Sequence, residues 1–256
     1  MVVVLLHPGG GQLAKHALVT GVGKGIGRAI ATKLLAEGWT VTGTYKSSAQ
    51  EARAFADSAD GLDVVQVDLG SREEREKLVA RFADTELDGL VNNAGIVQFE
   101  TLGAYDYDTW SETFEVNLQA PVHLTLALRS QLVPGSAVVN ISSVDGLTGS
   151  YNTPAYAASK AALLSATQSL ANVLGADGIR VNAVSPGWID TEMTVLADEA
   201  RRFTPLGRLG DPAEVGDAVA WLLGDQAEFV TGASVVIDGG YSNVDPVLKA
   251  EAGEDR

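Results

Sequence analysis

Two side chains that can move a proton together lie four positions apart in the chain. Tyr156 and Lys160 share one face of any helix that contains both, which brings the lysine ammonium towards the tyrosine hydroxyl. A phenol titrates near about pH 10, and a nearby cation favours its ionised form. The pair is therefore a candidate general acid and base. The same spacing is also common on helices whose side chains only pack. The pair alone therefore fits either a catalytic or a purely structural role.

A serine lies upstream of this pair, after a short apolar run. Ser143 follows Ala137–Ser142, which we expect to be a strand. Open parallel sheets bind ligands beyond the carboxyl ends of their strands, so the Ser143 hydroxyl can hold a carbonyl oxygen beside Tyr156. Asp145 is either a turn former or an acid that faces a substrate, and its place just after a strand favours the turn.

A glycine-rich stretch, Thr20–Gly27, lies between the first predicted strand and the first predicted helix. Its glycines let the backbone turn tightly and approach a pyrophosphate, whose charge then meets the N-terminus of the helix. Ordinary turns and close helix packing also need glycine, which is the alternative. The strand before the stretch and the helix after it favour a dinucleotide site.

The end of the second predicted strand indicates which dinucleotide this is. Sites for NAD(H) usually place an Asp or Glu there, which accepts from the ribose 2′-hydroxyl. This chain has Tyr45 and Lys46 instead, and Lys24 lies inside the glycine-rich stretch. Two cations can converge on a 2′-phosphate, although a single lysine is usually only a solvated side chain. We therefore expect NADP(H) to be preferred over NAD(H).

These side chains need a scaffold, and the chain alternates short β-branched runs with longer amphipathic stretches. This alternation is typical of βαβ units and predicts a single-domain α/β protein, a three-layer αβα Rossmann fold with a doubly wound, parallel, seven-stranded sheet. The expected strands are His16–Thr20, Thr40–Tyr45, Asp63–Val67, Gly89–Asn92, Ala137–Ser142, Arg180–Val184 and Ser234–Ile237. The expected helices lie near Ile26–Glu37, Ala49–Ala56, Arg72–Ala83, Tyr107–Leu132, Pro154–Leu174 and Pro212–Leu223. Residues 16–242 would form this domain, between a flexible N-terminal extension (1–15) and an acidic C-terminal tail (243–256).

Composition excludes several classes of protein. The 256 residues include 18 Lys and Arg against 33 Asp and Glu, a formal net charge of −15 that repels nucleic-acid phosphates and anionic lipid. The chain has no cysteine and only three scattered histidines, which disfavours disulfides, thiolate catalysis and a metal site. Met1–Lys15 lacks the basic start and apolar length of a signal peptide or membrane span. We expect a cytoplasmic protein with no nucleic-acid or membrane partner.

Taken together, these motifs resemble the short-chain dehydrogenase/reductase family over about His16–Ser242, and most of all its 3-oxoacyl-[acyl-carrier-protein] reductase-type members. Their order and spacing match the usual layout of the family. The matching motifs are Thr20-Gly21-x-x-x-Gly25-x-Gly27, Asn92-Asn93-Ala94-Gly95, Asn117, Ser143 with Tyr156-x-x-x-Lys160, Ser185-Pro186-Gly187 and Val235-Val236-Ile237-Asp238-Gly239-Gly240.

The resemblance implies hydride transfer between the nicotinamide C4 and the carbon of a carbonyl or secondary alcohol, without a metal. Tyr156 would exchange the proton, and Lys160 would lower the tyrosine pKa and bind the nicotinamide ribose. Ser143 would orient the substrate oxygen, and Asn117 would hold a water that links Lys160 to solvent. Outside the resemblance, Asn117 would be read as a local hydrogen-bonding residue of a helix.

The resemblance also implies a set of cofactor contacts. Asp68, after the third strand, would contact the adenine, and the Pro186-Gly187 turn and Thr191 would pack around the nicotinamide amide. The complete expected set is Gly21, Lys24, Gly25, Ile26, Gly27, Lys46, Asp68, Leu69, Asn93, Ala94, Gly95, Tyr156, Lys160, Pro186, Gly187, Ile189 and Thr191.

The substrate end of the site is less defined by the sequence. Val144, Tyr151 and Trp188 are candidate substrate contacts, and the aromatic pair can instead belong to a core or an interface. In the family the segment Trp188–Phe203 forms a mobile lid. Only 13 residues lie between Thr191 and Pro205, which predicts a more open pocket.

The expected substrate is a free ketone or keto-ester. A 3-oxoacyl group on an acidic carrier protein is one alternative, but Ser169–Gly178 lacks the basic docking residues of such reductases, and the net charge opposes an acidic partner. An NAD(P)-dependent sugar or alcohol dehydrogenase is another alternative. A regulatory or scaffold protein that binds NADP is the non-enzymatic one. By resemblance we expect a homotetramer or a dimer.

Overall fold

Seven parallel strands form one sheet in the order β3-β2-β1-β4-β5-β6-β7. The computed structural model describes residues 14–101, 103–192, 194 and 197–244. Within them the strands are β1 (His16–Val19), β2 (Thr40–Tyr45), β3 (Leu62–Gln66), β4 (Leu87–Asn92), β5 (Leu132–Ile141), β6 (Arg180–Pro186) and β7 (Ser234–Ile237). The order reverses between β1 and β4, the point at which doubly wound sheets bind ligands. The predicted fold class is confirmed.

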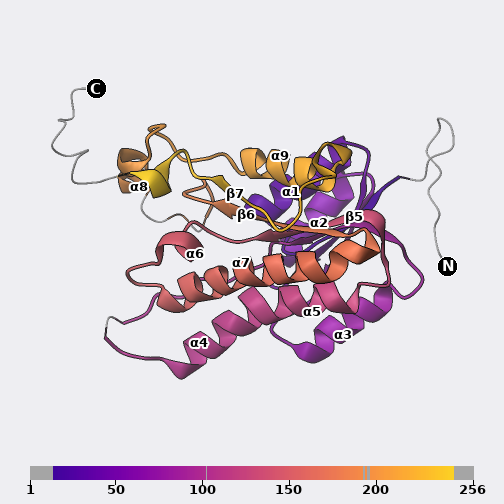
Figure 1. Ribbon diagram of the computed structural model, residues 1–256, viewed down its shortest axis with the longest axis horizontal. Helices are drawn as coiled ribbons and strands as arrows, with labels where there is room; N and C mark the ends of the chain where they lie inside the picture. Colours follow the sequence, from indigo (N-terminus) through magenta and orange to yellow (C-terminus); the bar gives the residue numbers. More distant parts are fainter. Residues whose placement is uncertain (1–13, 102, 193, 195–196, 245–256) are drawn as a thin grey trace.

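Helices cover both faces of the sheet (Figure 1). On one face α1 (Gly25–Ala36) packs against α9 (Pro212–Leu223), with α2 (Ala49–Ser58) beside β3. On the other lie α3 (Arg72–Arg81), α4 (Tyr107–Phe114), α5 (Ala120–Ala127) and α7 (Pro154–Leu174). Because both faces are covered, β1 and β6 are buried along nearly their whole length. Two apolar cores result, one on each side of the sheet.

The long helix predicted over Tyr107–Leu132 is wrong in two respects. After α4 the backbone forms a single π-helical turn, Glu115–Gln119, before α5 begins, and α5 ends at Ala127. Leu132 already starts β5, five residues before the predicted strand, because its backbone pairs beside Leu87 of β4. Hydrophobic periodicity does not reveal a π turn, because a single turn is too short for its own period to be recognised.

The remaining predicted helices and strands are present within a few residues of their expected bounds. Among the described residues, two short α-helices were not predicted: α6 (Asp145–Thr148) and α8 (Ala197–Phe203). No helix among the described residues is both long and apolar enough to span a membrane. Most of the predicted N-terminal extension and C-terminal tail lies outside the described residues, but Lys15 belongs to the fold, because its ammonium lies 2.8 Å from the Asp225 carboxylate.

Candidate active site and cofactor cleft

One pocket of about 700 Å³ lies beyond the carboxyl ends of the strands, a volume within the usual range for ligand sites. Every residue expected at the site contributes to its wall except Asn117, which lies behind it. The expected residues that line it are Gly21, Lys24, Gly25, Ile26, Gly27, Lys46, Asp68, Leu69, Asn93, Ala94, Gly95, Ser143, Val144, Tyr151, Tyr156, Lys160, Pro186, Gly187, Trp188, Ile189 and Thr191.

The glycine-rich turn forms a cradle that side chains would fill. A Cβ on Gly27 would lie 2.1 Å from the Gly21 carbonyl oxygen, and one on Gly23 would lie 1.9 Å from the Ser48 hydroxyl oxygen. Gly21 and Gly25 adopt positive φ angles of 78° and 56°, which other residues rarely adopt. These glycines bring the backbone close to any ligand in the cleft.

The start of α1 faces this cradle without a cap. Lys24, the N-cap residue, makes no side-chain capping bond, and the first turn carries no acid. The unpaired N–H groups and the positive end of the helix dipole therefore remain available to an anion. These features fit the pyrophosphate of a dinucleotide.

Asn93 fastens the glycine-rich turn to the end of β4. Its amide donates to the carbonyl oxygens of Thr20 at 2.8 Å and Gly21 at 3.3 Å. The Thr20 hydroxyl in turn accepts from the backbone N–H groups of Asn93 and Ala94. Asn93 and Thr20 together therefore hold the glycine-rich turn in place.

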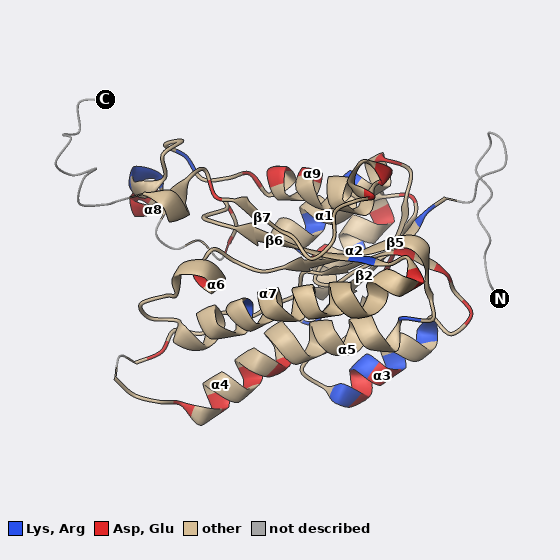
Figure 2. Ribbon diagram, in the orientation of Figure 1, with Lys and Arg blue, Asp and Glu red and all other residues tan. Residues whose placement is uncertain are grey.

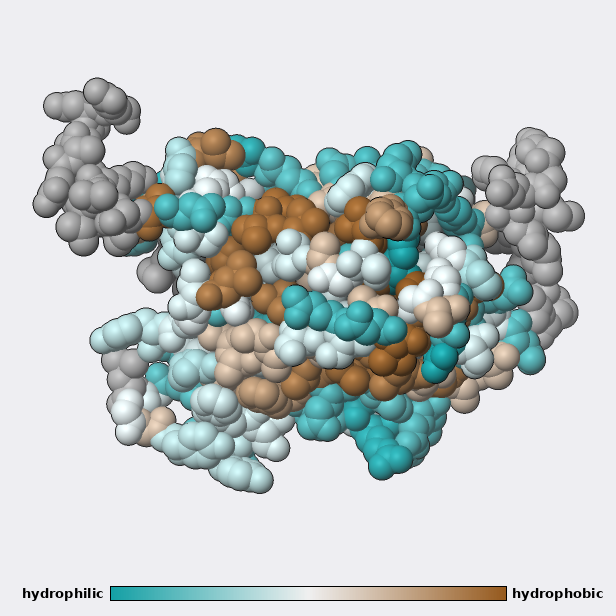
Figure 3. Space-filling model, in the orientation of Figure 1, coloured by the Kyte–Doolittle hydropathy of each residue, from teal (hydrophilic) through white to brown (hydrophobic). Residues whose placement is uncertain are grey.

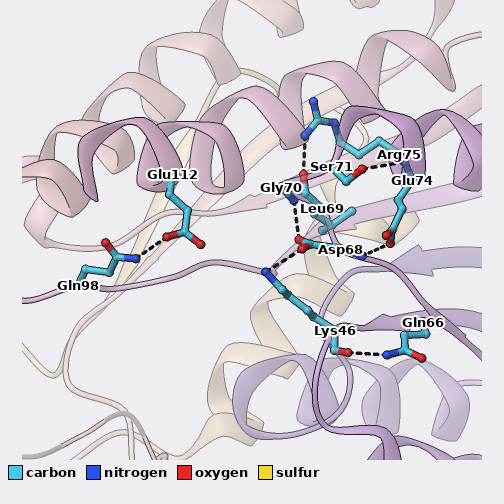
Figure 4. Close-up of polar contacts among 10 residues, drawn as sticks. All are labelled: Lys46, Gln66, Asp68, Leu69, Gly70, Ser71, Glu74, Arg75, Gln98 and Glu112. Carbon is cyan, nitrogen blue, oxygen red and sulfur yellow. Dashed lines mark hydrogen bonds and ion pairs between the residues drawn. The ribbon is translucent and has the colours of Figure 1, made fainter. Parts of the chain in front are cut away.

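Lys46 and Asp68 form an ion pair at the far end of the cleft, with the Lys46 Nζ 2.8 Å from an Asp68 carboxylate oxygen (Figure 4). The pair raises the pKa of Lys46. Partial burial raises the pKa of Asp68, but hydrogen bonds from Lys46 and the Gly70 N–H outweigh it and lower the pKa below its usual value. Both groups are therefore charged at neutral pH, and both line the pocket next to the ends of β2 and β3.

Lys24 lies at a different carboxylate. Its Nζ is 2.6 Å from Glu192, which follows Thr191, so the ion pair joins the glycine-rich turn to the segment after β6. The sequence predicted that Lys24 and Lys46 converge on one phosphate. In the structure each cation has its own acidic partner.

Sequence reasoning missed Arg75, a buried cation close to the Lys46–Asp68 pair in Figure 4. Its guanidinium donates to the Leu69 carbonyl oxygen and lies 2.6 Å from Glu115, the first residue of the π turn (Figure 4 shows the contact with Leu69). Arg75 therefore ties the loop after β3 to the segment that carries Asn117. A basic residue in a charged helix gives no signal of this role, because its neighbours in sequence are also charged.

Tyr156 and Ser143 meet at the inner end of the pocket. Burial raises the pKa of Tyr156 to about 12, and the negative charge of Asp145 adds to this effect, whereas a hydrogen bond with Ser143 opposes it. The tyrosine is thus protonated at neutral pH. The two hydroxyls can together hold and protonate one oxygen atom.

Lys160 lies on the same face of α7 as Tyr156, as the spacing predicted. Its Nζ is 5.6 Å from the centre of the tyrosine ring and donates to the Ile141 carbonyl oxygen at 2.7 Å. Burial lowers the pKa of Lys160 to about 8. The expected lowering of the Tyr156 pKa by Lys160 is absent, because burial dominates and the ammonium points to the Ile141 carbonyl.

Asn117 lies in the π turn, not in a regular helix. Its amide oxygen accepts from the Ile96 N–H at 2.8 Å, and its amide nitrogen donates to the Ile96 carbonyl oxygen at 2.9 Å and to Ser159 at 3.1 Å. A Cβ on Gly95 would lie 3.2 Å from the Asn117 amide oxygen and 3.4 Å from the Lys160 Nζ. Asn117 and Lys160 therefore approach each other across Gly95.

The segment after β6 forms the wall opposite the glycine-rich turn. The Gly187 N–H donates to the Ile237 carbonyl oxygen at 2.9 Å, and a Cβ on Gly187 would lie 2.6 Å from that of Asp238. Trp188 packs edge to face on Tyr241, with ring centroids 6.1 Å apart. Part of the predicted lid, residues 193, 195 and 196, lies outside the described residues.

The candidate substrate contacts differ in exposure. Val144 is buried, and its N–H donates to the Pro186 carbonyl oxygen at 3.0 Å. Tyr151 is 84% exposed at the pocket mouth, so it is not part of a core. Asp145 is half-buried in the same wall and begins α6.

Comparisons with known proteins agree with this geometry. A family model described as enoyl-(acyl carrier protein) reductase matches residues 21–242. The chain is 39% identical over 238 residues to the 3-oxoacyl-[acyl-carrier-protein] reductase FabG of Escherichia coli, covering 88% of this chain and 96% of the relative.

Two solved structures are also similar. A short-chain dehydrogenase from Burkholderia cenocepacia in complex with NADP has a TM-score of 0.86 at 35% identity, covering 90% of this chain and 98% of the other. A short-chain dehydrogenase/reductase from Brucella melitensis, described as a glucose/ribitol dehydrogenase, has a TM-score of 0.84 at 33% identity, covering 89% and 96%. The chain belongs to the short-chain dehydrogenase/reductase family and is an NAD(P)-dependent oxidoreductase that acts on a carbonyl or CH–OH group.

Proposed function

We propose that the protein reduces a free ketone or keto-ester with NADPH. The observation that carries this proposal is the protonated Tyr156 hydroxyl, which lies beside Ser143 at the inner end of a dinucleotide cleft. A tyrosine with a pKa of about 12 holds its proton at neutral pH and is ready to donate it to a carbonyl oxygen. NADPH supplies the hydride when bound.

The other residues hold the reactants. Ser143 would donate to the substrate oxygen, and Lys160 would bind the nicotinamide ribose. Asn117 would hold a water beside Lys160, because its amide oxygen approaches the Lys160 ammonium across Gly95. Asp68 would accept from the adenine amino group, and Pro186, Gly187 and Thr191 would surround the nicotinamide amide.

A 3-oxoacyl group on acyl carrier protein is the second candidate substrate, because the similar E. coli protein is named for that activity. Electrostatics oppose it. Helix α7 carries one charged residue, the buried Lys160, and nearby Arg129 lies 2.6 Å from Asp177. In the chain between β6 and the first turn of α9, Arg201 and Arg208 are paired with Asp198 and Glu214. An acidic carrier would meet cations that are already paired and a protein of net charge −15.

The test is the rate of NADPH consumption with free ketones, keto-esters, sugars and 3-oxoacyl thioesters. We expect fast reduction of free ketones or keto-esters. Turnover with thioesters alone would favour the carrier-protein substrate, and oxidation of sugars or polyols with NADP⁺ would favour the activity named for the Brucella protein. Tight NADPH binding with no turnover at all would favour a regulatory or scaffold protein.

The preference for NADPH is tested at Lys46. Replacing Lys46 by Ala removes the cation at the expected 2′-phosphate position and leaves Asp68 to repel it. We expect the Kd for NADPH to rise by about tenfold and that for NADH to change by less than about twofold, since only NADPH carries the extra phosphate. Binding is measured by the change in nicotinamide fluorescence.

The matched control is Lys77→Ala. Lys77 is an exposed lysine with an acidic partner, Glu73, at 2.6 Å, and it does not line the pocket. Its loss changes the net charge equally. Equal weakening of NADPH and NADH by Lys46→Ala would refute the assignment of Lys46 to the 2′-phosphate.

We also propose a homo-oligomer, dimer or tetramer, built on α5 and α7. Neither helix has an exposed charged residue, in a chain that is one-fifth charged, and both are almost wholly tan in Figure 2. Their outer surface includes Leu126 and Val173, 45% and 52% exposed, and Figure 3 shows apolar side chains gathered there. Light scattering that finds only monomer would exclude this assembly.

The absence of cysteine supports a cytoplasmic location.

A further inference from the structure

Asp145 differs from the other charged residues of the pocket wall. Lys24 pairs with Glu192 and Lys46 with Asp68, while Lys160 donates to the Ile141 carbonyl oxygen. Among the described residues, no hydrogen bond or ion pair reaches the Asp145 carboxylate. A half-buried carboxylate loses some of its hydrogen bonds to water. Without a partner in the protein, this loss is uncompensated and costs free energy.

The turn-forming role that the sequence favours does not account for this carboxylate. The residue does begin a short helix, but the bond that orders it runs from its own backbone N–H to the Ser143 hydroxyl, at 3.1 Å. Its backbone carbonyl accepts from the Gly149 N–H at 2.9 Å. The main chain of Asp145 therefore forms the turn, and its carboxylate takes no part in it.

Helix α6 is pressed against α7 at the catalytic lysine, which fixes Asp145 in place. A Cβ on Gly146 would lie 2.8 Å from the Lys160 carbonyl carbon and 2.9 Å from the Ala161 nitrogen. The carboxylate thus lies on a rigid support two residues from Ser143. Asp145, Ser143 and Tyr156 line the same pocket, and the Asp145 charge contributes to the raised pKa of Tyr156.

A carboxylate accepts hydrogen bonds and donates none. It therefore suits a substrate with a donor close to the reacting carbon, and it repels a carboxylate or phosphate there. An ammonium is a less suitable donor, because the same pocket end holds the Lys160 side chain. A hydroxyl is neutral and meets no such repulsion.

We propose that Asp145 accepts a hydrogen bond from a hydroxyl group on the carbon next to the substrate carbonyl, so that the preferred substrates are α-hydroxy ketones. The inference rests on the proposed ketone reduction and narrows its substrate class. In the reaction the carbonyl carbon gains a hydride from NADPH and the oxygen gains a proton from Tyr156. The product is a vicinal diol, and NADPH leaves as NADP⁺.

The test compares two substrates that differ by one hydroxyl, 1-hydroxy-2-butanone and 2-butanone. For the natural chain we expect kcat/KM to favour the hydroxy ketone by at least about tenfold, the usual effect of a charge-assisted hydrogen bond. In Asp145→Ala the ratio should fall to about one. A change in the pKa of Tyr156 would alter kcat/KM for both ketones equally. The ratio of the two kcat/KM values therefore reports only the contact between Asp145 and the substrate hydroxyl.

Two further variants accompany this test. Asp145→Asn keeps the size of the side chain and one acceptor oxygen, and it should give an intermediate ratio, which covers the case in which the Ala variant does not fold. Asp57→Asn removes the same charge from exposed α2, outside the pocket wall, and should leave the ratio unchanged.

Three results would overturn the inference. The first is equal kcat/KM for the two ketones in the natural chain, or the same ratio in Asp145→Ala as in the natural chain. Either outcome would refute the hydrogen bond to Asp145 without contradicting ketone reduction. A stronger preference for 1-amino-2-butanone than for the hydroxy ketone would assign the carboxylate to an ammonium. Turnover of neither ketone with NADPH bound would overturn the proposed function, and this inference with it.

Discussion

Replacing Tyr156 by Phe is expected to lower kcat by about 10³-fold, because the variant loses the proton donor while keeping the ring. The affinity for NADPH should stay within about twofold, since the cradle at Gly21–Gly27 and the Lys46–Asp68 pair lie at other parts of the cleft. Single-turnover rates with the preferred ketone measure the first quantity, and nicotinamide fluorescence measures the second.

Tyr45→Phe is the control for this substitution. Tyr45 is a buried tyrosine at the end of β2, 5% exposed, and it lines the pocket next to Lys46. Its loss of a hydroxyl should leave kcat unchanged. If Tyr156→Phe keeps more than about a tenth of the original kcat, another group supplies the proton.

The pH dependence should differ between the two directions of the reaction. Reduction needs protonated Tyr156, and a pKa raised to about 12 keeps that form present across the neutral and mildly alkaline range. Oxidation of the alcohol needs the phenolate, so its rate should rise with pH towards about 12. The ammonium of Lys160, with a pKa lowered to about 8, is progressively lost over the same range, which should weaken the ribose contact in both directions.

Much of the scaffold could be predicted because its signals are local. Each strand of the sheet is a short apolar run next to a turn, and parallel burial on both faces makes such runs easy to recognise. The spacing of Tyr156 and Lys160 on α7, and the strand and helix on either side of the glycine-rich turn, are also local patterns. These are the parts of the site that the structure reproduces.

The electrostatic partners could not be predicted, because each depends on segments that are distant in sequence. Lys24 meets Glu192 across 168 positions, and no periodicity relates the two. The raised pKa of Tyr156 follows from burial and from the negative charge of Asp145, which lies in α6, a helix too short to predict. The π turn at Asn117 is set by contacts with Ile96 and Ser159. The sequence therefore identifies the reacting groups but not the environment that sets their proton affinity.

Replacing Gly27 by Ala should disrupt the cofactor cradle. The added methyl would lie 2.1 Å from the Gly21 carbonyl oxygen and 2.4 Å from the Asn93 amide nitrogen, and both are held by hydrogen bonds that fasten the turn to β4. Relieving this overlap must move the turn away from α1, at a cost of about 1–3 kcal/mol. We expect the Kd for NADPH to rise by at least about tenfold, with a lower Tm.

Gly175→Ala separates this effect from a general response to removing a glycine. Gly175 ends α7 with φ of −60°, and a Cβ there would meet no atom within 4 Å. Alanine should therefore stabilise the protein slightly, by about 0.4–1 kcal/mol, through the entropy of the unfolded chain, and NADPH binding should not change. Tight NADPH binding by Gly27→Ala would mean that the turn can move without loss of the ligand, so that Gly27 serves only the packing of α1 against the turn. Suppose instead that Gly27→Ala binds NADPH at least about tenfold more weakly and that Gly175→Ala has a raised Tm. The loss of NADPH affinity would then be assigned to the displaced glycine-rich turn.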